Sequence, residues 1–135
     1  MGSDASQAAL KCYGAKRIGV ITPYMPVGDE QVRRFFTDCG FEIVKLKGLK
    51  CQSPVLIAHV SERELRDAIN EVNGPDVDAI IQVGTNLAMA RIAGIAEFWL
   101  DKPVLAINTC IYWWALRQNG IKDKVEGFGS LLQDH

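Results

Sequence analysis

The sequence predicts an α/β fold: a three-layer α-β-α, Rossmann-like domain whose four-stranded parallel sheet has the order 2-1-3-4. Two observations support this prediction. Short apolar and β-branched runs alternate along the chain with longer segments that carry apolar residues at helical spacing. This alternation is typical of a parallel sheet covered by helices on both faces. Right-handed crossovers then favour the flavodoxin-like strand order.

Four segments are predicted to form the strands. Residues 17–22 are a nearly continuous apolar run that stops at Pro23, which predicts a strand buried on both faces. Residues 41–46 alternate between apolar and polar side chains, which indicates a strand nearer to the sheet edge. The third and fourth strands are expected over residues 77–83 and 103–107.

The helices are expected around these strands. Residues 29–39 have apolar positions at helical spacing, and Gly40 follows them as a typical residue after a helix C-terminus. Ser61 and Glu64 form a capping-box pattern, in which the Ser61 hydroxyl accepts from the backbone of Glu64. Residues 48–58 have no clear period and are predicted to be a loop. Further helices are predicted over residues 6–13, 87–100 and 109–118.

Composition and charge exclude several classes of protein. Of the 135 residues, 48% are hydrophobic and 23% are charged, which is typical of one soluble globular domain over residues 1–135. Fifteen basic and sixteen acidic residues lack the basic excess of a nucleic-acid-binding protein. No apolar stretch is long enough to span a bilayer, and the N-terminus has no signal-peptide pattern. We therefore expect a cytoplasmic protein that binds neither nucleic acid nor membrane.

Cofactor and metal motifs are missing from the sequence. The four cysteines have no C-x-x-C spacing and there are two histidines, so we expect free thiols and no metal site. The segment after the first strand, residues 22–28, lacks the glycine pattern of a dinucleotide site, and the chain has no P-loop sequence. No cofactor is therefore expected.

A ligand site is predicted at one edge of the sheet. Open parallel sheets bind ligands beyond the carboxyl ends of the strands, where the strand order reverses. For the order 2-1-3-4 this point lies between the first and third strands, beside the fourth. The segments that follow these strands carry hydroxyl and amide groups, and two are expected to run straight into helix N-termini, which favour an anion such as a small carboxylate or phosphate. The candidate binding residues are Thr22, Tyr24, Gly84, Thr85, Asn86 and Asn108.

These residues also have structural interpretations. Threonines at strand-to-helix junctions are ordinary helix caps, so Thr85 and Thr109 are individually better explained by capping than by ligand contact. Tyr24 is not a capping residue type. A packed, hydrogen-bonded core tyrosine is an equal alternative to a ligand contact at that position.

Several short segments, taken in order, resemble a known family. They are Gly14-Ala15-Lys16-Arg17, Val20-Ile21-Thr22-Pro23-Tyr24, Gly84-Thr85-Asn86-Leu87, Lys102-Pro103-Val104, Asn108 followed by Trp113, Ala115-Leu116-Arg117, Gly120-Ile121 and Gly127-Phe128-Gly129-Ser130-Leu131-Leu132. From about Ala8 to the C-terminus the chain is similar to the second half of maleate cis-trans isomerases and arylmalonate decarboxylases of the aspartate/glutamate racemase superfamily.

The resemblance implies a function and roles for individual residues. Members of this family have two similar α/β halves with the active site between them, and a cysteine from each half serves as acid, base or nucleophile without a cofactor. By this resemblance Tyr24 corresponds to the tyrosine that donates to a substrate carboxylate. Thr85 and Asn86 correspond to the pair after the second-half cysteine, and Asn108 to a supporting asparagine.

The chain departs from the family pattern at three places. Gly84 stands where the family has its cysteine, and glycine offers neither a proton nor an electron pair. The entire first half is missing, and Ser53-Pro54 stands where maleate isomerases have a substrate-contacting asparagine. Cys110 is a weak substitute at a predicted helix N-terminus, where the pKa of a thiol falls. A small buried core residue is the favoured interpretation of Cys110.

The sequence therefore predicts a stand-alone half-domain that binds a small carboxylate or dicarboxylate, with catalysis lost or altered. One alternative is an active isomerase or decarboxylase that uses Tyr24 or Cys110 and works as a homodimer or split enzyme. Another is a non-catalytic interaction module without a small ligand. Because half a cleft leaves surface uncovered, a homodimer or a partner supplying the missing N-terminal half is expected. Tryptophan side chains at positions 99, 113 and 114 are expected mostly in the core, with one available for an interface.

Overall fold

The structure, a computed structural model that describes residues 2–135, is built on one parallel sheet. The strand order is β2-β1-β3-β4, and all neighbouring strands run parallel. The predicted α/β fold and strand order are confirmed, and the strand predicted nearer to an edge lies at the edge. The strands are β1 (Arg17–Thr22), β2 (Glu42–Gly48), β3 (Ala79–Gln82) and β4 (Val104–Ala106).

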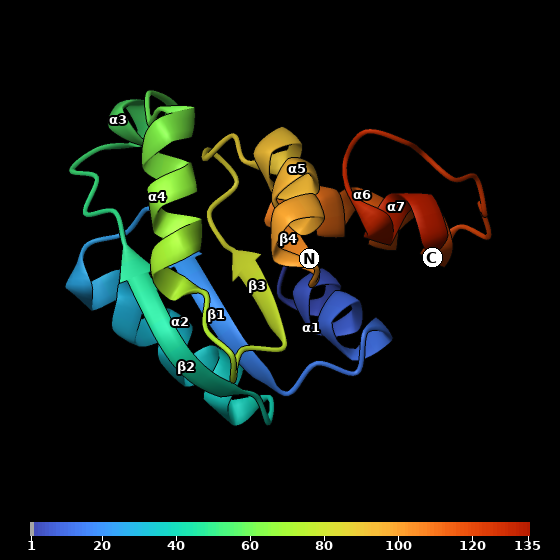
Figure 1. Cartoon of the computed structure of the whole chain (residues 1–135), viewed down its shortest axis with the longest axis horizontal. Coiled ribbons are helices and arrows are strands. Elements are labelled where there is room, and N and C mark those ends of the chain that lie inside the picture. Colours follow the sequence, from blue (N-terminus) through green and yellow to red (C-terminus); the bar gives the residue numbers. More distant parts are fainter. Residues whose placement is uncertain (1) are drawn as a thin grey trace.

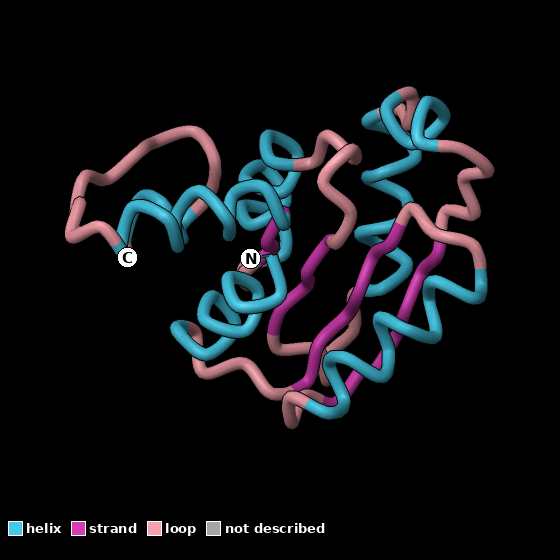
Figure 2. Tube along the Cα trace, turned by 180° about the vertical axis from the view of Figure 1, so that it is seen from behind, coloured by secondary structure: helices cyan, strands magenta, loops and turns pink. Residues whose placement is uncertain are grey.

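Helices cover both faces of this sheet (Figures 1 and 2). One face carries α1, α2 and α6, the other carries α4 and α5, and α7 packs beside α6. Among residues 2–135 no helix is long and apolar enough to cross a membrane. The helices are α1 (Gly2–Cys12), α2 (Pro26–Asp38), α3 (Pro54–Ala58), α4 (Glu62–Val72), α5 (Ala90–Leu100), α6 (Ile107–Gln118) and α7 (Ser130–Asp134).

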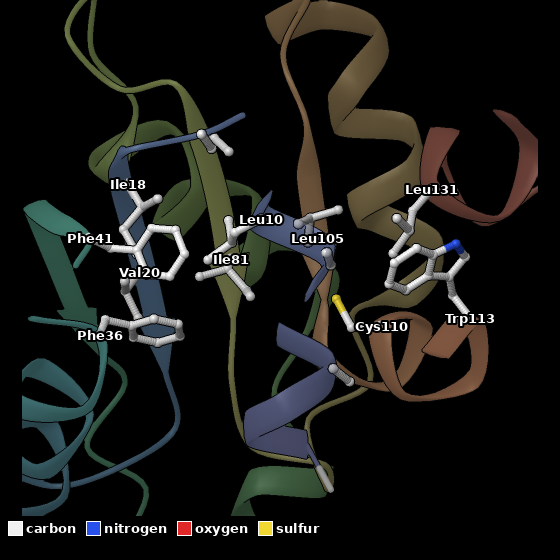
Figure 3. Close-up of a cluster of buried hydrophobic side chains, with 14 of the residues drawn as sticks. Leu10, Ile18, Val20, Phe36, Phe41, Ile81, Leu105, Cys110, Trp113 and Leu131 are labelled. Atoms are coloured by element: carbon white, nitrogen blue, oxygen red, sulfur yellow. The ribbon is translucent and has the colours of Figure 1, made fainter. Parts of the chain in front are cut away.

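The central strands are buried on both faces because successive side chains point to opposite sides of a strand. In β1, Ile18 packs in the core under α1, α2 and α6, whereas Ile21 packs under α4 and α5. In β3, Ile81 packs in the same core as Ile18, and Ile80 packs in the same core as Ile21. Figure 3 shows the first of these cores, which extends from Phe36 and Phe41 to Trp113 and Leu131. Trp114 is partly buried beside this core, whereas Trp99 is partly exposed on α5.

The predicted loop over residues 48–58 is wrong in its last part, which forms α3. The Ser53 hydroxyl accepts a hydrogen bond from the Leu56 N–H at 3.3 Å, and Pro54 occupies the first helical position. A helix of this length shows no periodic pattern, so the sequence gives only these capping signals. The capping pattern predicted for α4 is confirmed, because Ser61 Oγ accepts from the Glu64 N–H at 3.2 Å.

Several helix boundaries also differ from the prediction. The helix expected from residue 87 begins at Ala90, and the apolar residues before it, Leu87 and Met89, are core residues of a loop. The helix predicted over residues 109–118 is α6, which begins two residues earlier than predicted, at Ile107 directly after β4. The helix predicted over residues 29–39 begins at Pro26, since proline suits the first turn of a helix. The first helix begins earlier than predicted, and α7 was not predicted.

Candidate functional site

A pocket of about 480 Å³ opens at the carboxyl ends of β1 and β3. Tyr24 forms one side of it, and Gly84 and Thr85 form another. The remaining walls come from the first turns of α1, one face of α2 and the start of α6. The pocket therefore lies at the edge of the sheet where the sequence places a ligand, between the first and third strands.

The structure brings three of the six candidate binding residues to this pocket, and the other three are not among its lining residues. The three that line it are Tyr24, Gly84 and Thr85. Thr22 is fully buried; its hydroxyl donates to the Asp29 carboxylate and accepts from the Tyr24 N–H at 3.1 Å. Thr22 therefore holds the first turns of α2 against the end of β1.

Asn86, in the loop after β3, and Asn108, in the first turn of α6, are both exposed and do not line the pocket. The Asn108 amide donates to the Thr85 carbonyl at 3.0 Å, and Asn86 lies in a turn closed by the Leu87 N–H. Because α5 begins only at Ala90, the Thr85 segment does not run straight into a helix, contrary to the sequence prediction. Thr85 and Thr109 cap no helix either: no side chain caps α5 or α6, and Thr109 is buried within α6.

The Tyr24 hydroxyl is free to contact a ligand. The ring is partly buried, but the hydroxyl has no hydrogen-bond partner among residues 2–135. A Cβ atom built on Gly28 would lie 2.7 Å from Tyr24 Cβ, so the absence of a side chain at Gly28 lets the tyrosine lie against α2. The arrangement differs from the hydrogen-bonded core tyrosine considered from the sequence.

The first turns of α1 add a polar wall that sequence reasoning missed. Ser3 and Ser6 both line the pocket, and the buried Ser6 hydroxyl donates to the Ser3 carbonyl at 2.9 Å. The first N–H groups of a helix have no intrahelical partners. The sequence predicts a helix here but does not show that its N-terminus reaches the carboxyl edge of the sheet. Gln31 of α2 was missed for a similar reason.

Among residues 2–135, the pocket lining contains no cationic side chain and no cysteine. Cys110 lies in the core with a fully buried side chain, next to Leu105 (Figure 3). Burial raises the pKa of the Cys110 thiol to about 12, so the expected fall in its pKa at a helix N-terminus is not found. Burial also raises the pKa of Cys51. Within residues 2–135 no group of histidine, cysteine or acidic residues is placed to hold a metal ion.

Gly84 has a backbone conformation that side chains rarely adopt. Its φ is +96°, and a Cβ atom at this position would lie 2.6 Å from Pro23 Cγ and 2.8 Å from Pro23 Cδ. The loop after β3 therefore passes close to the loop after β1 only because residue 84 has no side chain.

Residues 1–132 match the family model described as arylmalonate decarboxylase. A maleate isomerase of Alcaligenes faecalis is 25% identical over 125 residues, which are 91% of this chain and 49% of that protein.

Solved structures agree in fold. A maleate isomerase variant from Pseudomonas putida S16 with maleate has a TM-score of 0.92 at 26% identity, over 97% of this chain and 53% of that one. A mutant maleate cis-trans isomerase of Nocardia farcinica, with a covalently bound succinylcysteine intermediate, has a TM-score of 0.95 at 23% identity, over 99% and 55%. The chain spans about half the length of these relatives.

Proposed function

Because the chain belongs to the arylmalonate decarboxylase family, we propose that this half-domain binds a small carboxylate or dicarboxylate in the pocket beyond β1 and β3. The observation that carries the proposal is a set of unpartnered donors on the pocket wall. The Tyr24 hydroxyl and the N–H groups of Gly84 and Thr85 have no hydrogen-bond partner among residues 2–135. Such donors suit carboxylate oxygens, and no cation is needed.

The rest of the pocket suits the carbon skeleton of such a ligand. Val32 and Phe35 of α2 form an apolar wall, and Val83 and Ile107 add to it. A ligand with a carboxylate at one end and an apolar body would bury its body against these side chains. The two kinds of surface fix which end of the ligand meets Tyr24.

We further propose that catalysis is lost or altered. Gly84 occupies the place at which, by the resemblance, the family carries a cysteine. Among residues 2–135, no cysteine from elsewhere in the chain lines the pocket. The buried Cys110 thiol stays protonated at neutral pH and does not reach the lining. The pocket is therefore left with donors for a carboxylate but without a thiol to attack a carbon or move a proton.

One set of measurements tests both parts. Proton NMR in D₂O with maleate, phenylmalonate and the enantiomers of aspartate and glutamate is expected to show no turnover. Maleate or phenylmalonate at one hundred times its dissociation constant is expected to stabilise the fold by about 2.7 kcal/mol, which a thermal shift detects. Turnover that disappears in Cys110→Ala would contradict the loss of catalysis. The absence of stabilisation by any carboxylate would contradict binding and favour an interaction module.

Tyr24→Phe is expected to weaken carboxylate binding about 10- to 150-fold, because a hydrogen bond to a charged group contributes about 1.5–3 kcal/mol. Its stability without ligand is expected to stay unchanged, since the hydroxyl bonds to no other described residue. Isothermal titration calorimetry measures the affinity. Tyr112→Phe, on the exposed surface of α6, is the matched control and is expected to bind like the wild type. Equal affinities for the two variants would exclude Tyr24 from the ligand contacts.

We also propose that a second chain covers the pocket, either another copy or a separate half. Two observations support this. The chain spans about half the length of its relatives, and apolar Met25 and Val27, beside the pocket, are 45% and 76% exposed. Burying these two apolar side chains against a partner would remove them from water and so stabilise the complex.

Val27→Asp is expected to convert a dimer to a monomer, because dimerisation would bury the new carboxylate. Light scattering at tens of micromolar measures the state. Phe98→Asp is the control, since Phe98 is 94% exposed on α5, away from the pocket. A wild-type monomer would rule out the homodimer. A dimer disrupted by the Phe98 variant alone would place the interface elsewhere.

A further inference from the structure

Gln82 is a fully buried polar side chain at the end of β3 whose hydrogen bonds reach the loop after β3 and the start of α6. Its Nε2 donates to the carbonyls of Val83 at 2.7 Å and Gly84 at 2.8 Å. Its Oε1 accepts from the Ile107 N–H at 3.3 Å, at the start of α6. The orientation of the amide is determined, because the Ile107 N–H must meet the oxygen and the two carbonyls must meet the nitrogen.

These bonds determine where the next two N–H groups point. In a planar trans peptide the carbonyl and the following N–H point in opposite directions. Because the Val83 and Gly84 carbonyls point to Gln82, the N–H groups of Gly84 and Thr85 point away from it. Both residues line the pocket, and the left-handed φ of Gly84 is the kind of backbone that brings successive N–H groups to one anion.

We propose that Gln82 is a positioning residue of the candidate site: it turns two consecutive peptides so that the N–H groups of Gly84 and Thr85 face the ligand. It does so without lining the pocket itself. Gln82 also connects the loop after β3 to the start of α6, which keeps these two parts of the pocket wall at a fixed distance from each other. The orientation of the peptides stands on the geometry alone, whereas their use in binding rests on the proposed function.

Gln82→Met tests the proposal, because methionine has a similar length and no strong hydrogen-bonding groups. The turn after β3 remains closed in this variant, since the Leu87 N–H also donates to the Gly84 carbonyl, at 3.1 Å. The residual dipolar coupling of the Gly84 N–H is expected to change most, because the Val83 carbonyl loses its bond from Gln82, whereas the Leu87 N–H still holds the Gly84 carbonyl and with it the Thr85 N–H. Exchange of the Ile107 amide proton is expected to accelerate at least about tenfold. Ile69→Val, a buried change on α4, is the control for a general loss of stability. Unchanged couplings in Gln82→Met would overturn the proposal.

Binding is measured separately with maleate as the probe. Gln82→Met is expected to bind maleate about tenfold more weakly than the wild type, as for a lost bond to a charged group, and Ile69→Val equally well. Altered couplings with wild-type affinity would overturn the role of these N–H groups in binding. If the wild type binds no carboxylate, the proposed function fails, and the couplings still decide the orientation.

The wild type provides a readout that does not depend on the folding of any variant. The two Gln82 side-chain amide protons are expected to exchange slowly with solvent, because the side chain is fully buried and its Nε2 donates to two backbone carbonyls. Exchange as fast as that of an exposed glutamine would overturn the proposal.

Discussion

Gly84→Cys is expected to lower the free energy of unfolding by about 2–6 kcal/mol and not to create an active thiol. The φ of +96° costs a residue with a side chain about 1–3 kcal/mol. The new Cβ would in addition lie 2.6 Å from Pro23 Cγ, and overpacking of this kind costs about 1–3 kcal/mol. Urea unfolding of the variant and the wild type measures the difference.

Gly40→Ala separates the two costs. Gly40 has a similar φ of +93°, but a Cβ there meets no atom within 4 Å. Its loss of stability therefore measures backbone strain alone, and Gly84→Ala measures strain plus contact with Pro23. Equal losses for the two alanine variants would show that Pro23 gives way freely.

Because of this contact, the effects of substitutions at residues 23 and 84 on the free energy of unfolding are expected not to be additive. Pro23→Ala removes both ring atoms that oppose a side chain at Gly84, so the double variant is expected to recover part of the stability lost in Gly84→Cys. A single Gly84→Cys variant that is as stable as the wild type and turns over maleate would contradict the prediction that a cysteine at this position is strained and inactive.

The fold was predictable because its strong signals are local. Continuous apolar runs such as residues 17–22 are typical of buried parallel strands, and the strand–helix alternation leaves few topologies. Boundaries were less predictable where local patterns conflict with packing. Leu87 and Met89 have the spacing of a helix but serve the core from a loop, and α3 is too short for a period.

The site was predictable only at its centre. Strand order and the polar residues after each strand led to Tyr24, Gly84 and Thr85, which line the pocket. The remaining polar groups depend on tertiary placement. Ser3 reaches the pocket because of how α1 packs, and Gln82 acts from the interior, where a glutamine in a strand gives no sequence signal. Asn86 and Asn108 do not line the pocket, and Asn108, in the first turn of α6, donates to the Thr85 carbonyl.

Glu97→Ala is expected to lower the free energy of unfolding by about 3–5 kcal/mol and to release α7. The Glu97 carboxylate accepts from the Ser130 N–H at 2.7 Å, from the Ser130 hydroxyl at 2.8 Å and from the Val104 N–H at 3.3 Å. The Tyr13 hydroxyl extends the network to the end of α1 by a hydrogen bond with Ser130 Oγ. Loss of one carboxylate therefore leaves three donors, two in α7 and one in β4, without their acceptor. Urea unfolding measures the loss, and limited proteolysis of residues 119–135 reports the release.

Glu126→Ala, on the exposed loop before α7, is the control and is expected to change neither readout. Ser130→Ala keeps the bond from the Ser130 N–H to Glu97. Its loss of stability is therefore expected to lie between those of Glu126→Ala and Glu97→Ala. The effect of Glu97→Ala is expected to reach the pocket, because Leu131 of α7 and Leu10 of α1 belong to the same core, and the first turns of α1 line the pocket. A weaker affinity for maleate in Glu97→Ala at a temperature where the variant is folded would show this connection. Unchanged proteolysis would instead mean that the apolar contacts of Leu131 and Leu132 hold α7 without the carboxylate.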